Sequence, residues 1–314
     1  MRLGMGLIAG SLALVLVGCS TSGVSSSPAI PKTVSPPPAP VLTPEQKGQA
    51  LIENLSRHMV QVQSHFDAPG GLRGFIVQPL GKKRGSIIYT DASGEYLFSG
   101  AIINAKGENI TQQETSTYID SKLIDPMYQD LSGLSYFTQG QDAAPHKIYI
   151  VFDPNCSICH MVYSVVQPMI ASGNLQVRWV PVGIMQQSSV GKSAAILMGK
   201  TDADRVALLK QDEDSFDMKT ESGGIPELKR DPAPAAPASG QAPAVPLAPV
   251  VPDPAVIHAF DLVAKNNQYF SDYGFNGTPV FFLKYKTGEK KFFPGFYQGT
   301  WLSDEIAKTG ADWS

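Results

Sequence analysis

Two cysteines lie where a predicted strand gives way to a predicted helix, and this junction limits the folds open to the chain. Residues 147–152 form an apolar run rich in β-branched and aromatic side chains, which suits a strand covered on both faces. Beyond Cys156 and Cys159, apolar residues recur at helical spacing over residues 161–170, and residues 175–182 form a second strand. This order predicts a parallel strand pair joined by a right-handed crossover, and so an α/β domain.

The position of the two cysteines favours redox chemistry. Cys156 lies at the predicted helix N-terminus, where unpaired N–H groups and the helix dipole stabilise a thiolate. Cys159 follows one turn later on the same face. The pair can therefore alternate between dithiol and disulfide, with Cys156 attacking a substrate and Cys159 resolving the mixed disulfide. We predict that both residues are catalytic.

Three other roles for this segment stay open at this point. The first is a purely structural disulfide. The second is a metal site, whose nearby ligand candidates are only His146 and His160, so we predict none. The third is c-type haem, because residues 156–160 read Cys-Ser-Ile-Cys-His, although a strand running into the first cysteine is unusual for haem attachment. We expect no bound cofactor, and His160 either tunes the pair or is exposed to solvent.

A second sequence feature that favours redox chemistry lies near the C-terminus. Thr278 and Pro279 follow a glycine and begin an apolar strand, a position at which proline can adopt the cis form. Residues 279–285 and 290–293 predict a hairpin around a Thr-Gly turn. Further helices are predicted near these ranges: 190–199, 202–211, 255–269 and 302–309.

The N-terminus predicts export and anchoring. Residues 3–17 form a short apolar stretch typical of a signal peptide rather than a membrane span. The sequence Leu-Val-Gly-Cys that follows resembles the lipobox of bacterial lipoproteins, so we expect residues 1–18 to be removed and Cys19 to carry lipid. Ser20 resembles an outer-membrane sorting signal. The predicted location is therefore the periplasm, with a lipid anchor in the outer membrane.

Amino-acid composition separates stretches that are not expected to fold from those that can form domains. Residues 19–44 are rich in Ser, Thr and Pro and cannot bury enough apolar surface to fold, so a disordered tether is expected. A Pro/Ala-rich stretch at residues 231–254 is expected to form a surface loop within the later domain. With 314 residues, 43% of them hydrophobic, the chain can form two domains. A net charge of −3 argues against nucleic-acid binding.

The N-terminal half predicts a smaller α+β unit. Residues 44–65 show helical spacing of apolar residues. Three short β-type runs follow, separated by turn residues: 74–78, 85–90 and 95–104. A unit of about 70 residues has a marginal core, which a second copy of the chain would relieve. Residues 116–134 predict a connecting helix with a kink at Pro126.

Motifs along residues 66–310 resemble the thioredoxin superfamily and, more narrowly, the periplasmic disulfide isomerase family of DsbC and DsbG, with the DsbG branch the more similar. Their order and spacing agree with that family. The stretches are Gly-Leu-Arg-Gly at 71–74, Gly-Glu-Tyr-Leu-Phe-Ser-Gly at 94–100, Phe-Asp-Pro-Asn-Cys at 152–156, Val-Pro-Val-Gly at 180–183, Ser-Gly-Gly at 222–224 and Gly-Thr-Pro at 277–279.

The resemblance implies a domain organisation. It consists of a cystatin-like α+β dimerisation domain at residues 45–115, a linker helix at residues 116–144, and a thioredoxin-like α/β domain with a helical insertion at residues 145–314. It also implies that Pro279 is a cis-proline facing the cysteine pair and that Thr278 presents its backbone to the substrate protein. The implied partners are a second copy of the chain, misfolded or cysteine-oxidised envelope proteins, and a DsbD-like membrane reductant.

One departure concerns the dipeptide between the cysteines. It is Ser157-Ile158, whereas Pro-Tyr or Gly-Tyr is expected in the family. These two residues, with His160, are expected to tune the redox potential. We therefore predict an envelope thiol–disulfide oxidoreductase that isomerises or reduces disulfides, or reduces sulfenic acids, in exported proteins. The alternatives are a periplasmic chaperone with secondary redox activity, a disulfide oxidase and a c-type haem protein.

Overall fold

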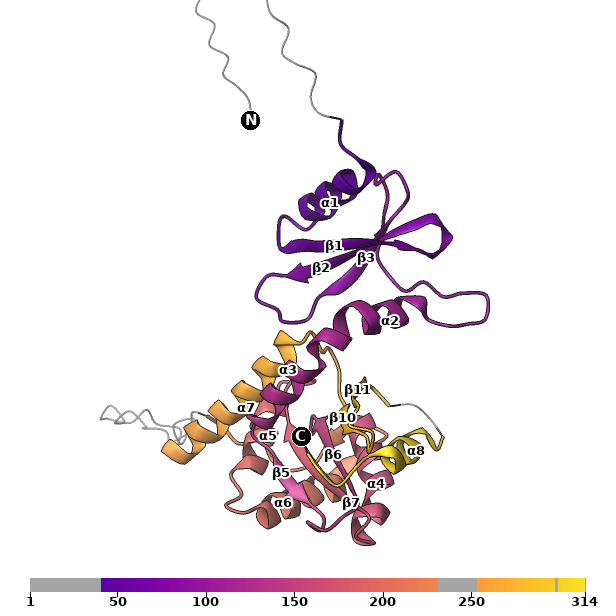
Figure 1. The fold of residues 1–314 in the computed structure, drawn as a ribbon. Helices are drawn as coiled ribbons and strands as arrows, with labels where there is room; N and C mark the ends of the chain where they lie inside the picture. Colours follow the sequence, from indigo (N-terminus) through magenta and orange to yellow (C-terminus); the bar gives the residue numbers. More distant parts are fainter. Residues whose placement is uncertain (1–40, 231–252, 297–298, 314) are drawn as a thin grey trace, which may run out of the picture. The chain divides into compact units, whose positions relative to one another are not determined.

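The computed structural model describes residues 41–230, 253–296 and 299–313 (Figure 1). The predicted signal, Cys19 and most of the tether and of the Pro/Ala-rich stretch lie outside the described residues. Within the described parts of the chain, no helix has the length and apolar character needed to cross a bilayer.

The N-terminal region is a helix and a four-stranded antiparallel sheet in the order β1-β2-β3-β4. Helix α1 begins with a capping box at Thr43 and buries Ile52 against Phe75 and Val77 of the sheet. The element bounds are α1 Pro44–Leu55, β1 Val60–Ala68, β2 Leu72–Pro79, β3 Ser86–Thr90 and β4 Leu97–Phe98.

The prediction of a helix over residues 44–65 was wrong for the second half of that range. Helix α1 ends at Leu55, the backbone turns through positive φ angles of 51° at Arg57 and 58° at His58, and β1 begins at Val60. The apolar residues of this segment fit a helix, but those in β1 pair with β2 instead. Long-range strand pairing therefore overrides the local periodicity. Strand β4 is also much shorter than the predicted run at 95–104.

The connecting helix begins earlier and ends earlier than predicted. Helix α2 (Ile110–Thr115), a wider π-type turn (Ser116–Asp120) and α3 (Ser121–Ser132) form one continuous helical stretch. Pro126 lies inside α3 without ending it. The segment predicted as linker also contains β5 (Phe137–Gln139), which pairs with the main sheet.

The second region is built on a five-stranded sheet in the order β11-β10-β6-β7-β5. Strands β6 (His146–Phe152) and β7 (Leu175–Pro181) are parallel, which confirms the predicted crossover through α4 (Ser157–Ala171). Strands β10 (Val280–Lys284) and β11 (Lys290–Pro294) form the predicted hairpin.

Helices cover both faces of this sheet. Ile148, Ile150 and Phe152 of β6 pack with side chains of α4 and α8 (Trp301–Lys308). Tyr149 and Val151 point to the other face and pack with side chains of α3 and α7 (Pro254–Asp272). The uninterrupted apolar run of β6 follows from burial on both sides.

A helical insertion separates β7 from β10. It contains α5 (Ser189–Leu197), α6 (Asp202–Ser215), the short strand pair β8 (Phe216–Asp217) and β9 (Ser222–Gly223), and α7. Helix α6 starts with a capping box at Thr201. This insertion supplies several of the buried polar side chains around the cysteine pair.

Candidate active site

Cys156 and Cys159 are free thiols at the start of α4. Cys156 is the N-cap of the helix, and its sulfur accepts a hydrogen bond of 3.3 Å from the Cys159 N–H. The two residues are only 2% and 4% exposed. The loop preceding α4, which follows directly from β6, holds the first thiol at the helix N-terminus, as the sequence predicted.

The two thiols differ in acidity. The hydrogen bond from the Cys159 thiol, opposed by burial, lowers the pKa of Cys156 to about 7, and the Cys159 N–H assists. Burial, together with the neighbouring Cys156, raises the pKa of Cys159 well above its ordinary value. Near neutral pH Cys156 is therefore partly ionised, while Cys159 keeps its proton. Of the two thiols, Cys156 is therefore the more acidic.

Thr278 and Pro279 lie beside the nucleophile. The peptide bond between them is cis, as the sequence analysis anticipated, and the Cys156 thiol donates to the Thr278 carbonyl at 3.3 Å. The pairing of β10 with β6 brings this distant segment to the cysteines. The buried side-chain hydroxyl of Thr278 has no hydrogen-bond partner.

Asp153 anchors the loop that precedes Cys156. One carboxylate oxygen accepts from the Asn155 N–H at 2.8 Å and from the Ser189 hydroxyl at 2.7 Å. The other accepts from the N–H groups of Ile184 and Met185, at 2.7 and 2.9 Å. The carboxylate is fully buried, so these bonds hold the loop against the start of the insertion.

Asn155 makes a second connection to the insertion. Its amide nitrogen donates to the hydroxyls of Ser188 and Ser189 at 3.1 and 2.9 Å. Its carbonyl oxygen accepts from the ammonium of Lys192 at 2.7 Å, and Lys192 also donates to the Gly223 carbonyl. Because Lys192 is 5% exposed, this charge-assisted bond lies in a low-dielectric environment.

His160 is buried at 5% exposure, so the expectation that it is exposed to solvent is wrong. One ring nitrogen lies 2.7 Å from the Glu213 carboxylate, the other 3.1 Å from the Pro154 carbonyl, and the ring stacks on Phe216 at 3.8 Å. Burial alone would lower the pKa of His160, but the hydrogen bond and charge of Glu213 outweigh it and raise that pKa. Burial also raises the pKa of Glu213.

These contacts argue against the haem alternative. Both ring nitrogens of His160 are engaged by protein groups, so neither is available to bind iron. Within the described ranges, no three His, Cys, Asp or Glu side chains cluster closely enough to hold a metal ion.

Sequence reasoning missed the residues that hold the active-site loop: Asp153, Asn155, Lys192 and Glu213. The Asp-Pro-Asn segment was recognised only as part of a family-like motif. Lys192 and Glu213 lie far along the chain in helices with ordinary polar patterns, and only the fold brings them to the cysteines.

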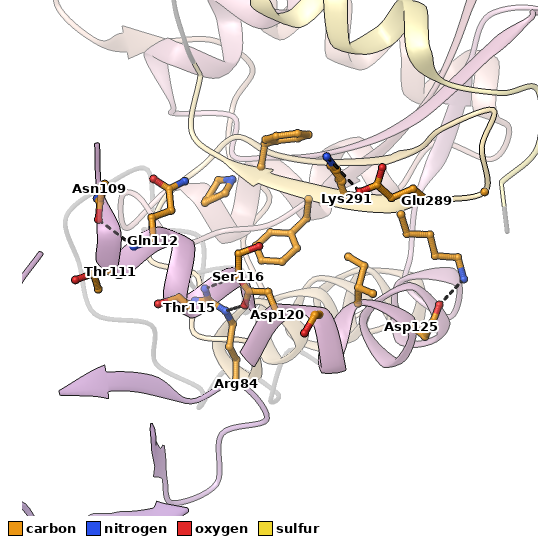
Figure 2. A pocket seen from close by; sticks show the side chains of 17 residues that line it. Arg84, Asn109, Thr111, Gln112, Thr115, Ser116, Asp120, Asp125, Glu289 and Lys291 are labelled. Carbon is orange, nitrogen blue, oxygen red and sulfur yellow. Dashed lines mark hydrogen bonds and ion pairs between the residues drawn. The ribbon is translucent and has the colours of Figure 1, made fainter. Parts of the chain in front are cut away.

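A separate groove of about 870 Å³ lies between the α2–α3 helical stretch and β11 (Figure 2). Each charged side chain in its lining has a partner. These ion pairs are Arg84 with Asp120 at 2.6 Å, Lys290 with Asp125 at 2.9 Å and Lys291 with Glu289 at 3.3 Å. The groove contains neither cysteine and is not part of the redox site.

Known proteins resemble parts of the chain. Residues 43–112 match the family model described as the disulfide bond isomerase protein N-terminal domain. The thiol:disulfide interchange protein DsbG of Pseudomonas aeruginosa is 28% identical over 163 residues, which cover 52% of this chain and 59% of that protein. DsbG of Escherichia coli is 32% identical over 172 residues, covering 53% and 62%. The chain thus spans about three fifths of the length of these relatives.

Among solved structures, the catalytic domain of Proteus mirabilis ScsC has a TM-score of 0.38 and 15% identity, covering 57% of this chain and 96% of that one. A thioredoxin-like oxidoreductase from Silicibacter pomeroyi has a TM-score of 0.37 and 16% identity, covering 58% and 95%.

The sheet with helices on both faces, carrying a cysteine pair at a helix N-terminus against a cis-proline, defines a thioredoxin-like protein. Here that domain follows a region that matches the N-terminal domain of disulfide bond isomerases. Two DsbG proteins are in addition similar to about half of the chain.

Proposed function

We propose that this chain is a thiol–disulfide oxidoreductase that isomerises or reduces disulfides in exported proteins. The observation that carries the proposal is the contrast in acidity between Cys156 and Cys159 beside the Thr278 carbonyl. The Cys156 thiolate attacks one sulfur of a client disulfide. The client S–S bond breaks, a mixed disulfide forms, and the other client sulfur leaves as a thiolate.

Two outcomes follow from the mixed disulfide. If a client thiolate attacks the client sulfur, a new client disulfide forms and Cys156 is released, so the net reaction is isomerisation. If Cys159 attacks Cys156, the client leaves reduced and the pair becomes a disulfide, which needs two electrons from a DsbD-like reductant. Because the buried Cys159 resists ionisation, its attack is slow, which favours isomerisation. A sulfenic acid on a client cysteine is a second substrate, with water as the leaving product.

The proposal extends to location and assembly. The chain acts in the periplasm, held to the outer membrane by lipid on Cys19, and forms a homodimer through residues 45–115. The signal-like N-terminus and the DsbG relatives motivate the location. The match of residues 43–112 to the isomerase N-terminal domain motivates the dimer. A Cys19→Ser variant should move to the soluble periplasmic fraction, and the purified protein should have twice the chain mass by light scattering.

A trapping experiment tests the activity. Cys159→Ala removes the resolving thiol, so mixed disulfides on Cys156 should accumulate in the cell envelope and be identified by mass spectrometry. The matched control is the double variant Cys156→Ala/Cys159→Ala, which should trap nothing. Clients with several cysteines indicate isomerisation or disulfide reduction, and single-cysteine clients indicate sulfenic-acid reduction. A trap that stays empty while the wild-type pair cycles between thiols and disulfide contradicts the proposal.

A further inference from the structure

A mostly apolar pocket of about 420 Å³ lies on the exposed side of α4. Its apolar lining is Met161 and Val165 of α4, Phe216 and Met218 of the insertion, and Phe296 beyond β11. Met161, Val165 and Met218 are 39%, 43% and 44% exposed. Large apolar side chains gathered around one hollow on a protein surface are typical of a binding site.

Two parts of the chain connect the pocket with the cysteine site. Met161 and Ser164 lie on α4 four and seven residues after Ser157, so they line the face directly below the residue that follows the nucleophile. On the other side, Phe296 comes directly after Gly295, whose N–H donates to the Pro279 carbonyl at 2.8 Å. Helix α4, whose N-cap is Cys156, and the segment that is hydrogen-bonded to Pro279 therefore both contribute to the pocket walls.

The chemistry of the lining selects an apolar occupant. The ionisable groups in the lining, His160 and Glu213, bond each other, and His160 also bonds the Pro154 carbonyl. A charged ligand group would lose its water without gaining a free partner. Methionine side chains are flexible and polarizable, so Met161 and Met218 can fit apolar groups of different shapes.

We propose that this pocket binds an apolar side chain of the client protein, a few residues from the cysteine that joins Cys156. The inference rests on the proposed function, because the mixed disulfide brings the client segment to the pocket. The volume is within the usual range for ligand sites. An extended segment advances about 3.3 Å per residue, so only positions close to the client cysteine can reach it.

The test uses full-length Cys159→Ala protein and short peptides, each carrying one cysteine activated as a mixed disulfide with thionitrobenzoate. Leu or Asp is placed at each of the four positions on either side of the cysteine. At one position or more, the Leu peptide should form the mixed disulfide about tenfold faster than the Asp peptide, as expected for partial burial of one large apolar side chain.

Pocket variants identify the source of this preference. Met218→Glu should remove most of it and leave the reaction with glutathione disulfide unchanged. Met198→Glu is the matched control, because Met198 is 37% exposed and lies outside the pocket; it should keep the preference. Equal rates for Leu and Asp peptides at all positions, or equal losses in both variants, overturn the pocket assignment while the proposed function stands. Failure of Cys156 to react even with glutathione disulfide overturns both.

Discussion

Replacing Cys159 by alanine should make Cys156 a weaker acid. The hydrogen bond from the Cys159 thiol is the largest cause of the low pKa of Cys156, which is about 7. The alanine variant removes this donor and keeps the backbone N–H of residue 159, which lies 3.3 Å from the Cys156 sulfur. The experiment therefore separates the contribution of the thiol from that of the helix N-terminus.

The size of the effect follows from the energy of one hydrogen bond to a charged group. Such a bond contributes about 1.5–3 kcal/mol, and one pKa unit corresponds to about 1.4 kcal/mol. Loss of the Cys159 thiol should therefore raise the pKa of Cys156 by about one to two units, to about 8–9. A Cys159→Ser variant retains an O–H donor, so its Cys156 should stay close to the wild-type pKa of about 7.

The assay is the pH dependence of alkylation by iodoacetamide, since Cys156 is then the only thiol of a variant that also carries Cys19→Ser. The midpoint of the rate profile reports the pKa. The rate at high pH should rise, because a more basic thiolate is a better nucleophile. A midpoint that remains near 7 in the alanine variant would refute the reasoning and assign the low pKa to the backbone N–H groups of α4.

Three further predictions concern stability. The pKa of His160 is raised in the folded protein, so the stability from its pairing with Glu213 is lost as pH rises from about 6.5 through the raised value. The difference in unfolding free energy between wild type and Glu213→Gln should therefore shrink as pH rises above about 6.5 in urea titrations. Lys192→Met leaves the buried oxygen of Asn155 without its charged donor and should cost about 1–3 kcal/mol in the same titrations, whereas an unchanged unfolding free energy would contradict the network. Gly94→Ala should lower the melting temperature, because Gly94 has a φ of 74° and a Cβ there would lie 2.2 Å from a backbone oxygen of α1; unchanged melting would contradict this backbone packing.

The position of the cysteine pair at a strand-to-helix junction could be predicted from sequence, because the patterns that indicate it are local. The apolar run of β6, the two cysteines and the stripe of α4 are adjacent in the chain, and the structure has them in the predicted order. The Gly-Thr-Pro segment could also be recognised locally, because a proline that begins a strand after a glycine can adopt the cis form. Its cis bond agrees with the prediction. Local sequence was less reliable where a segment suited two structures, as at Met59 and Val62, whose spacing fits a helix while Val62 lies in a strand.

The sequence by itself determined that two cysteines lie at the start of a helix, where backbone N–H groups favour a thiolate. Only the tertiary structure decided what surrounds them. It buries His160 against Glu213, joins Asn155 to Lys192, and places Met218 and Phe296 beside α4. These contacts link residues far apart in the chain, and their strength depends on burial that only the folded protein provides. No local pattern of charge or hydrophobicity encodes such burial, because it depends on how distant segments pack.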